Sequence, residues 1–157
     1  MMQFSVPGRD VYDIDHLILD YNGTIAEDGR LISGVADRIR ALSTEITVHV
    51  ITADTHGTAR TQLAHLPCTV MVISEANQDR QKRDYLDKLG RHRTVAIGNG
   101  ANDCLMLHHA AFGICVIQAE GAATGALQAA TMVCTDIRQA LDLLLHPRRV
   151  TATLRNA

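Results

Sequence analysis

The sequence predicts an α/β fold in which helices cover both faces of a parallel sheet. Short apolar runs rich in β-branched residues recur along the 157 residues, and segments with helical periodicity separate them. The apolar runs occupy residues 14–19, 47–52, 68–73, 94–97, 113–117 and 131–134. Strands that alternate with helices of about ten residues pair in parallel, because each helix carries the chain back across the sheet. With no linker or repeat in the chain, we expect a single Rossmann-like domain over residues 1–157, with its core at about 13–147.

Residues that favour helix ends bound the segments between the predicted strands. Side chains that can cap a helix N-terminus stand before four of them, at Ser33, at Thr55 or Thr58, at Asn77, and at Thr135 or Asp136. Gly90 ends the third helix, and Pro147 follows the last one, which runs through Leu145. Further helices are expected at 103–111 and 121–130.

Two shorter segments complete the predicted architecture. Residues 26–32, with Asp28 and Gly29 at their centre, predict a small β-hairpin flap directly after the first strand. Residues after Pro147 are expected to form a tail packed on the surface.

The composition excludes several classes of protein. With 46% hydrophobic and 20% charged residues, the chain is neither disordered nor membrane-spanning. A net charge of −2 with three Tyr, two Phe and no Trp argues against nucleic-acid binding. Residues 1–9 lack the layout of a signal peptide. The four scattered cysteines are typical of a reduced core, so we expect a cytoplasmic protein.

Polar residues gather where the predicted strands end. Asp20 ends the first strand, Thr52 ends the second, and 98–103 follows the fourth and opens a helix. The carboxyl ends of parallel strands share one edge of the sheet, where such folds bind ligands. The chain has only two lysines, and Lys82 lies nearer that edge than Lys88, about 9 Å further along the same helix. A carboxylate at this edge could act as a nucleophile or as a metal ligand, a hydroxyl at a helix start can bind phosphate, and one cation can neutralise that phosphate.

These segments resemble, in order, the four motifs of the haloacid dehalogenase (HAD) phosphohydrolase superfamily. The matching residues are Asp20-Tyr21-Asn22-Gly23-Thr24, Thr52-Ala53-Asp54, Lys82 and Gly98-Asn99-Gly100-Ala101-Asn102-Asp103. They are most similar to the phosphorylation domain of P-type ATPases, and in particular to a soluble P-type-ATPase-like subgroup. The resemblance extends over roughly residues 13–155.

The resemblance implies a role for each matching residue. Asp20 would be the nucleophile that becomes an aspartyl phosphate, Thr52 would hydrogen-bond the phosphoryl group, and Lys82 would neutralise its charge. The phosphate would also lie against Asn22, Gly23, Ala53 and Asp54. The implied cofactor is Mg²⁺, held by Asp20, the backbone carbonyl of Asn22, Asn99 and, directly or through water, Asp103. The expected activity is hydrolysis of a phosphoric ester whose alcohol part the sequence does not identify.

Two amides stand where phosphatases of this superfamily carry acids. Asn22 occupies the position of the usual general acid and cannot shuttle a proton. Since general acid–base help is worth roughly 10²–10⁴-fold, turnover should be slow but not abolished. Asn99 replaces the first acid of the fourth motif, so its amide oxygen would bind the metal without charge. Asp54 and His56 are the candidates for a substitute proton donor.

The spacing of the motifs leaves no room for a cap domain or a nucleotide-binding domain. Residues 20–52 hold only a hairpin and a helix, and residues 52–82 hold a helix and a strand. An ATP-driven pump is therefore excluded. The resemblance implies that a capless member closes its site through an oligomer or acts on bulky substrates, and a homo-oligomer, either a dimer or a tetramer, is expected.

Simpler interpretations stand beside this one. Asp20 could end a turn, Thr52 and Asp54 could be ordinary helix caps, and Lys82 could be a solvated charge. Cys104 and His108 have the i, i+4 spacing of metal ligands, but the sequence has no second pair with zinc spacing. Two functions remain: a phosphatase that works through Asp20, or an attenuated domain that binds phosphate or a protein partner for regulation.

Overall fold

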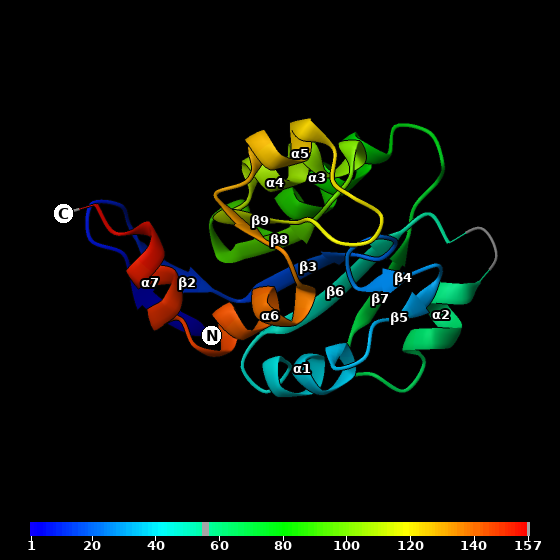
Figure 1. Ribbon diagram of the computed structural model, residues 1–157, viewed down its shortest axis with the longest axis horizontal. Coiled ribbons are helices and arrows are strands. Elements are labelled where there is room, and N and C mark those ends of the chain that lie inside the picture. The colour runs from blue at the N-terminus through cyan, green and yellow to red at the C-terminus, as the bar shows by residue number, and fades with distance from the viewer. Residues whose placement is uncertain (55–56, 157) are drawn as a thin grey trace.

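A computed structural model describes residues 1–54 and 57–156 and shows a six-stranded, wholly parallel sheet (Figure 1). In spatial order the strands are β10 (Met132–Cys134), β9 (Phe112–Val116), β8 (Thr94–Gly98), β3 (His16–Asp20), β6 (Thr47–Thr52) and β7 (Thr69–Val72). The central strand β3 pairs Leu17 with Val48 of β6 and with Val95 of β8. The sheet predicted from the apolar runs is confirmed, with strand ends shifted by one or two residues.

Helices cover both faces of this sheet, as the sequence predicts (Figure 1). One face carries α1 (Val35–Leu42), α2 (Thr58–Leu63) and α6 (Ile137–Leu145), and the other carries α3 (Gln78–Leu89), α4 (Cys104–His109) and α5 (Thr124–Ala129). Successive residues of β3 point to opposite faces. Leu17 and Leu19 accordingly pack with the α1 and α6 side, while Ile18 packs with α3 and α4.

The predicted helix ends at Asn77, Gly90 and Asp136 are confirmed, although the side chain of Asn77 makes no capping hydrogen bond. Asn77 precedes α3, Gly90 follows it, and the side chain of Asp136 accepts the N–H of Arg138 at the start of α6. Elsewhere glycines in the left-handed conformation replace the expected caps, since Gly34 and Gly57 precede α1 and α2. Part of the helix expected at 103–111 is a 3₁₀ turn, η2 (Ala101–Asp103), that leads into α4. Thr55, an alternative start for α2, lies outside the described residues.

The predicted hairpin flap is present. Its strands are β4 (Ala26–Glu27) and β5 (Arg30–Leu31), and the turn residues Asp28 and Gly29 have φ values of 50° and 80°. Positive φ at both positions is what a two-residue hairpin loop requires. The hydroxyl of Tyr21 donates to the carbonyl of Gly29 at 2.8 Å, which ties the flap to the loop after β3.

The two ends of the chain form a unit that the sequence pattern did not reveal (Figure 1). An antiparallel pair, β1 (Met2–Ser5) and β2 (Val11–Ile14), precedes β3, and the tail expected after Pro147 forms the helix α7 (Arg148–Leu154). Val150 is fully buried, and the hydroxyl of Thr151 donates to the carbonyl of Ser5 at 2.8 Å. The hydrophobic core therefore extends beyond residues 13–147 at both ends. A short 3₁₀ turn, η1 (Arg91–Arg93), leads into β8.

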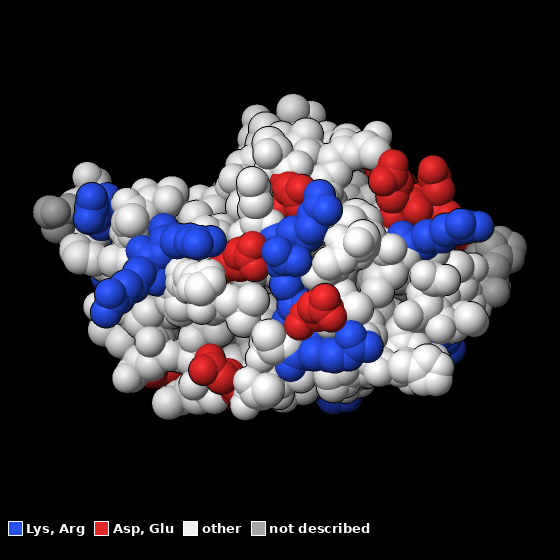
Figure 2. All heavy atoms as spheres, turned by 60° about the horizontal axis from the view of Figure 1, so that its bottom comes forward, with Lys and Arg blue, Asp and Glu red and all other residues white. Residues whose placement is uncertain are grey.

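Three properties of the described chain bear on function. Between β3 and β6 it holds only the hairpin and α1, so no cap domain interrupts the fold there. No helix in residues 1–54 and 57–156 has the length and apolar character needed to cross a bilayer. Arg38 of α1 pairs with Asp142 of α6 at 2.8 Å. Positive and negative side chains are interspersed on the face seen in Figure 2.

Candidate active site

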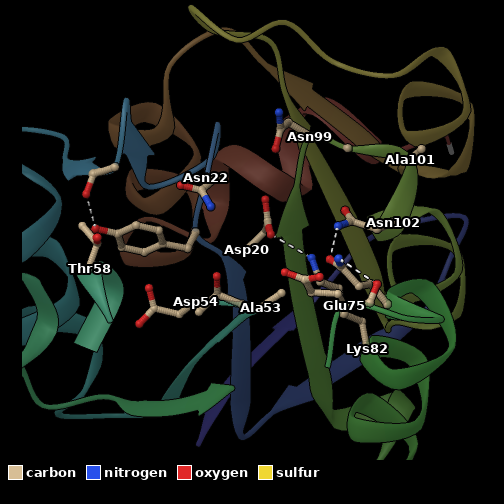
Figure 3. A pocket seen from close by; sticks show the side chains of 15 residues that line it. Asp20, Asn22, Ala53, Asp54, Thr58, Glu75, Lys82, Asn99, Ala101 and Asn102 are labelled. Atoms are coloured by element: carbon tan, nitrogen blue, oxygen red, sulfur yellow. Dashed lines mark hydrogen bonds and ion pairs between the residues drawn. The ribbon is translucent and has the colours of Figure 1, made fainter. Parts of the chain in front are cut away.

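The loops that follow β3, β6 and β8 meet at one edge of the sheet and surround a pocket of about 860 Å³ (Figure 3). Asp20, Thr52, Lys82 and Asn99 all line it. These four residues lie up to 79 positions apart in the chain. The parallel sheet brings them together because the carboxyl ends of its strands share this edge.

At the base of the pocket, Lys82 connects two carboxylates. Its Nζ lies 2.8 Å from Oδ1 of Asp20 and 2.8 Å from Oδ1 of Asp103. Lys82 is 1% exposed, Asp103 is 0% exposed and Asp20 is 7% exposed, so the cluster is shielded from water except on the Asp20 side. The interpretation of Lys82 as a solvated charge is wrong, since α3 directs this lysine into the interior.

Burial and the neighbouring charges shift the pKa of Asp20 and of Lys82. Burial raises the pKa of Asp20 above its ordinary value, and the nearby charge of Asp103 adds to that effect, while Lys82 opposes it. Burial lowers the pKa of Lys82, but the two carboxylates outweigh burial and leave that pKa raised. Lys82 is thus a permanent cation beside Asp20.

Asp103 supports the site from behind, because it is buried and does not line the pocket. Its Oδ2 accepts the backbone N–H groups of Asn99 at 3.1 Å and Gly100 at 3.0 Å. A Cβ on Gly98 would lie 2.5 Å from Cγ of Asp103, so only glycine leaves room for this carboxylate. Asp103 was expected to hold the metal either directly or through water, and this placement favours the contact through water.

Asn99 and the loop after β3 hold each other in place. The hydroxyl of Thr24 lies 3.2 Å from Oδ2 of Asp20 and 3.0 Å from Oδ1 of Asn99, and Nδ2 of Asn99 donates to the carbonyl of Gly121. Gly23 has a φ of 78°, and a Cβ there would lie 2.4 Å from Nδ2 of Asn99. Its N–H donates to the carbonyl of Ala26, and Gly23 does not line the pocket. Gly23 therefore serves the turn, and the structure does not bring it to the expected phosphate position.

Two residues of the second motif, Thr52 and Asp54, have different roles in the structure. Thr52 is 5% exposed and lines the pocket, and its hydroxyl has no hydrogen-bond partner among the described residues. Asp54 also lines the pocket, but its oxygens accept the N–H groups of Ala59 at 2.9 Å and Arg60 at 3.2 Å. Asp54 thus caps α2, as the simpler interpretation expected, while Ala53 lies between the two on the pocket wall.

The side chain of Asn22 is exposed and lines the pocket on the same side as Asp20 (Figure 3). Because its amide cannot donate a proton as an acid does, the described residues place no general acid at this position. His56, one of the suggested substitutes, lies outside the described residues.

Motif spacing did not identify five side chains that complete the pocket. They are Tyr21, Thr58, Glu75, Gln78 and Asn102. Asn102 belongs to the fourth motif and Tyr21 to the first, whereas Glu75 and Gln78 come from the loop before α3 and its first turn. Residues 74–78 follow β7, so their position at the end of a parallel strand was the available signal.

The oxygen donors at the pocket suit a hard divalent cation. Asp20 supplies a carboxylate, and Asn22 and Asn99 supply neutral oxygens, a set that Mg²⁺ accepts at reduced charge. Within residues 1–54 and 57–156 no group of three or more His, Cys, Asp and Glu side chains is arranged to hold a metal. The Cys104–His108 pair consequently lacks the further ligands that a zinc site needs.

Comparison with known proteins places this chain in a family. No family model matches it. An uncharacterized protein of Methanocaldococcus jannaschii, MJ0073, is 48% identical over 64 residues, which are 41% of this chain and 69% of that protein. The chain belongs to the family of MJ0073. The name of MJ0073 describes no activity, so the family relationship does not indicate what reaction this chain catalyses.

Solved structures identify the fold of this MJ0073 family member. A HAD family hydrolase from Streptomyces avermitilis superimposes with a TM-score of 0.69 and 24% identity, covering 87% of each chain. A 3-deoxy-D-manno-octulosonate 8-phosphate phosphatase from Moraxella catarrhalis, in complex with magnesium, phosphate and the sugar, gives 0.72 and 15% identity, covering 89% of this chain and 90% of that one. The fold is that of the HAD hydrolases, as the four motifs predicted. The P-type-ATPase-like subgroup stays a prediction.

Proposed function

We propose that this protein is a divalent-metal-dependent phosphomonoesterase that works through an aspartyl phosphate on Asp20. The observation that carries the proposal is the buried cluster in which Lys82 lies 2.8 Å from both Asp20 and Asp103 at the base of an open pocket. Structural neighbours with this fold include a phosphatase solved with magnesium and phosphate.

Each residue of the cluster has a task in phosphoryl transfer. A carboxylate oxygen of Asp20 attacks phosphorus, the bond from phosphorus to the ester oxygen breaks, and the alcohol leaves. Lys82 and the hydroxyl of Thr52 neutralise and position the phosphoryl oxygens, which is most of what this reaction needs. Water then hydrolyses the acyl phosphate and restores Asp20. Mg²⁺, held by Asp20, Asn22 and Asn99, would supply further charge stabilisation.

Asn22 makes the proposed enzyme slow. With no acid at that position, the leaving alkoxide takes its proton from water, so esters with good leaving groups are the favoured substrates. The same substitution slows the attack of water on the phosphorylated Asp20. We therefore expect the phosphoenzyme to accumulate during turnover.

The decisive experiment is hydrolysis of an aryl phosphate with and without Mg²⁺, with Asp20→Asn as the control. We expect metal-dependent hydrolysis by the wild-type protein and none by the variant. Equal rates would contradict the enzyme and favour the rival function, a regulatory domain that binds phosphate or a protein partner, to which Asn22 and Asn99 point.

A second variant tests the missing acid. Asn22→Asp should raise turnover by about tenfold or more, because a general acid contributes roughly 10²–10⁴-fold where it is correctly placed. No gain would locate the limitation at Asn99 and the metal.

A further inference from the structure

The pocket is larger than a phosphate group requires. Its volume of about 860 Å³ is within the range of sites that hold small organic ligands. Its wall includes the polar side chains of Tyr21, Thr58, Glu75, Gln78 and Asn102. Figure 3 shows Thr58, Glu75 and Asn102 around the pocket. The alcohol part of a bound phosphomonoester would therefore lie against a polar wall.

This wall carries more negative than positive charge. Among the described residues that line the pocket, Asp20, Asp54 and Glu75 are acidic, and Lys82 is the only lysine or arginine. Lys82 is already paired with Asp20 and with the buried Asp103 at 2.8 Å each. The described pocket thus holds no spare cation for a second acidic group on a substrate.

Glu75 occupies a loop that is held rigidly in place. The side chain of Gln81 bonds to both neighbours of Glu75, accepting the N–H of Ser74 and donating to the carbonyl of Ala76 at 2.6 Å. Gln78 donates to the carbonyl of Glu75 at 3.2 Å and accepts from Nδ2 of Asn102 at 2.8 Å. The carboxylate of Glu75 itself has no partner among the described residues. Its fixed backbone and unpaired oxygens make it an acceptor prepared for a ligand.

From this wall we infer the substrate class of the proposed phosphomonoesterase, so the inference rests on that function. The site takes phosphate monoesters of alcohols that carry hydroxyl or ammonium donors and no second negative charge, and Glu75 determines this selectivity. Hydroxyl and ammonium groups donate to the carboxylate of Glu75, whereas a carboxylate on the substrate meets it without a counterion.

Two matched pairs of substrates test the selectivity. Glycerol 3-phosphate and 3-phosphoglycerate differ in a hydroxymethyl group against a carboxylate, and phosphoethanolamine and phosphoserine differ in one added carboxylate. We expect kcat/KM to be about tenfold or more higher for the partner without the carboxylate in each pair, the size of one moderate charge–charge interaction. Comparison of glycerol 3-phosphate with phosphoethanolamine separates recognition of hydroxyls from recognition of an ammonium group.

Variants assign the effect to Glu75. Glu75→Gln should reduce the preference within each pair by about threefold to tenfold, chiefly through a lower KM for the acidic partner. Glu45→Gln is the matched control, since Glu45 is exposed in the turn before β6, at the opposite edge of the sheet, and should keep both the aryl phosphatase activity and the preference.

A binding measurement keeps this test separate from the test of catalysis. Titration calorimetry of Asp20→Asn with each pair, with and without Glu75→Gln, compares the same ligands without turnover. Equal or stronger binding and hydrolysis of the acidic partners would overturn the inference, as would a preference that Glu75→Gln leaves unchanged. If instead the wild-type protein hydrolyses aryl phosphate no faster than Asp20→Asn does, the proposed function itself is overturned.

Discussion

Lys82 is the residue on which both stability and chemistry of the site depend. It is fully buried between Asp20 and Asp103, so its charge is the counterion that makes two acids tolerable in the interior. The same charge faces the pocket, where a phosphoryl group would meet it. One side chain therefore links folding to the proposed activity.

Replacing Lys82 should reveal both roles. Lys82→Met leaves two buried carboxylates without a cation, and we expect the free energy of unfolding to fall by about 3–5 kcal/mol. Urea denaturation at pH 7.5 measures this. Asp20→Asn removes one of the two negative charges, so it should abolish activity but reduce the free energy of unfolding far less than Lys82→Met does. Lys88→Met, on an exposed side chain of the same helix, should change neither activity nor stability. A Lys82→Met protein as stable as the wild type would contradict the ion-pair cluster.

His49 gives the molecule a predicted sensitivity to acid. It is 5% exposed in β6, its Nε2 lies 3.1 Å from Nδ1 of His16, and its Nδ1 lies 2.7 Å from the hydroxyl of Tyr85. Burial, with a smaller effect of His16, lowers the pKa of His49 to about 4. The folded protein therefore holds this imidazole neutral at pH values where the unfolded chain would protonate it.

The sign of the pH effect follows from that difference. Above pH 6.5 both states are neutral and His49 contributes no pH dependence. As the pH falls from 6.5 towards 4, the unfolded state binds a proton that the folded state resists, so stability decreases by up to about 3 kcal/mol. Thermal or urea unfolding between pH 7.5 and 4.5 should show a flatter slope for His49→Phe. His92→Gln, at an exposed site in η1, should keep the wild-type slope.

At the scale of elements, the loop between β9 and α5 connects the loop that follows β3 to the loop that follows β8. Nε2 of Gln118 donates to the carbonyls of Gly23 at 3.3 Å and Thr24 at 2.9 Å, and its Oε1 accepts the N–H of Ile137 at the start of α6. A few residues on, Ala123 donates its N–H to the carbonyl of Asn99. The loop thus positions the segment after Asp20 relative to Asn99, although neither Gln118 nor Ala123 lines the pocket.

Gln118 is accordingly expected to be a positioning residue. Gln118→Ala leaves two carbonyls and one N–H without their partner, which should lower stability by about 1–3 kcal/mol and kcat for aryl phosphate by about tenfold, with a smaller change in KM. Gln118→Glu keeps the acceptor for Ile137 but loses the two donors, so an intermediate kcat is expected. Gln128→Ala, on an exposed position of α5, is the matched control. An unchanged kcat in Gln118→Ala would show that the loop does not need this support.

At the scale of the molecule, the open pocket is the feature from which we predict association with other copies of the chain. The described chain has no cap domain, and the hairpin β4–β5 borders only part of the pocket. Other copies of the chain packed over the pocket would supply the missing cover and limit access of bulk solvent and large ligands to the site. We therefore predict a homo-oligomer, a dimer or a tetramer, in light scattering coupled to size exclusion. A monomer at assay concentration would contradict this prediction.

Much of the fold could be predicted because local patterns and global topology agree. The strand Thr47–Thr52 has the bounds that its apolar run predicts, and Asn77 and Gly90 bound α3 as expected. The unit formed by β1, β2 and α7 was missed because its partners lie at opposite ends of the chain. The local pattern of apolar and polar residues does not predict a contact between distant segments, such as the hydrogen bond from Thr151 to Ser5.

The sequence by itself determined the parallel sheet, the order of the four motifs and the identity of Asp20, Thr52, Lys82 and Asp103, because strand period and residue chemistry are local properties. Only the tertiary structure decided what each residue does there. It buried Lys82 between two acids, turned Asp54 to cap α2, used Gly23 for a turn against Asn99, and brought Glu75 to the pocket wall. Those outcomes depend on distances between segments far apart in the chain, which packing of the sheet and helices sets.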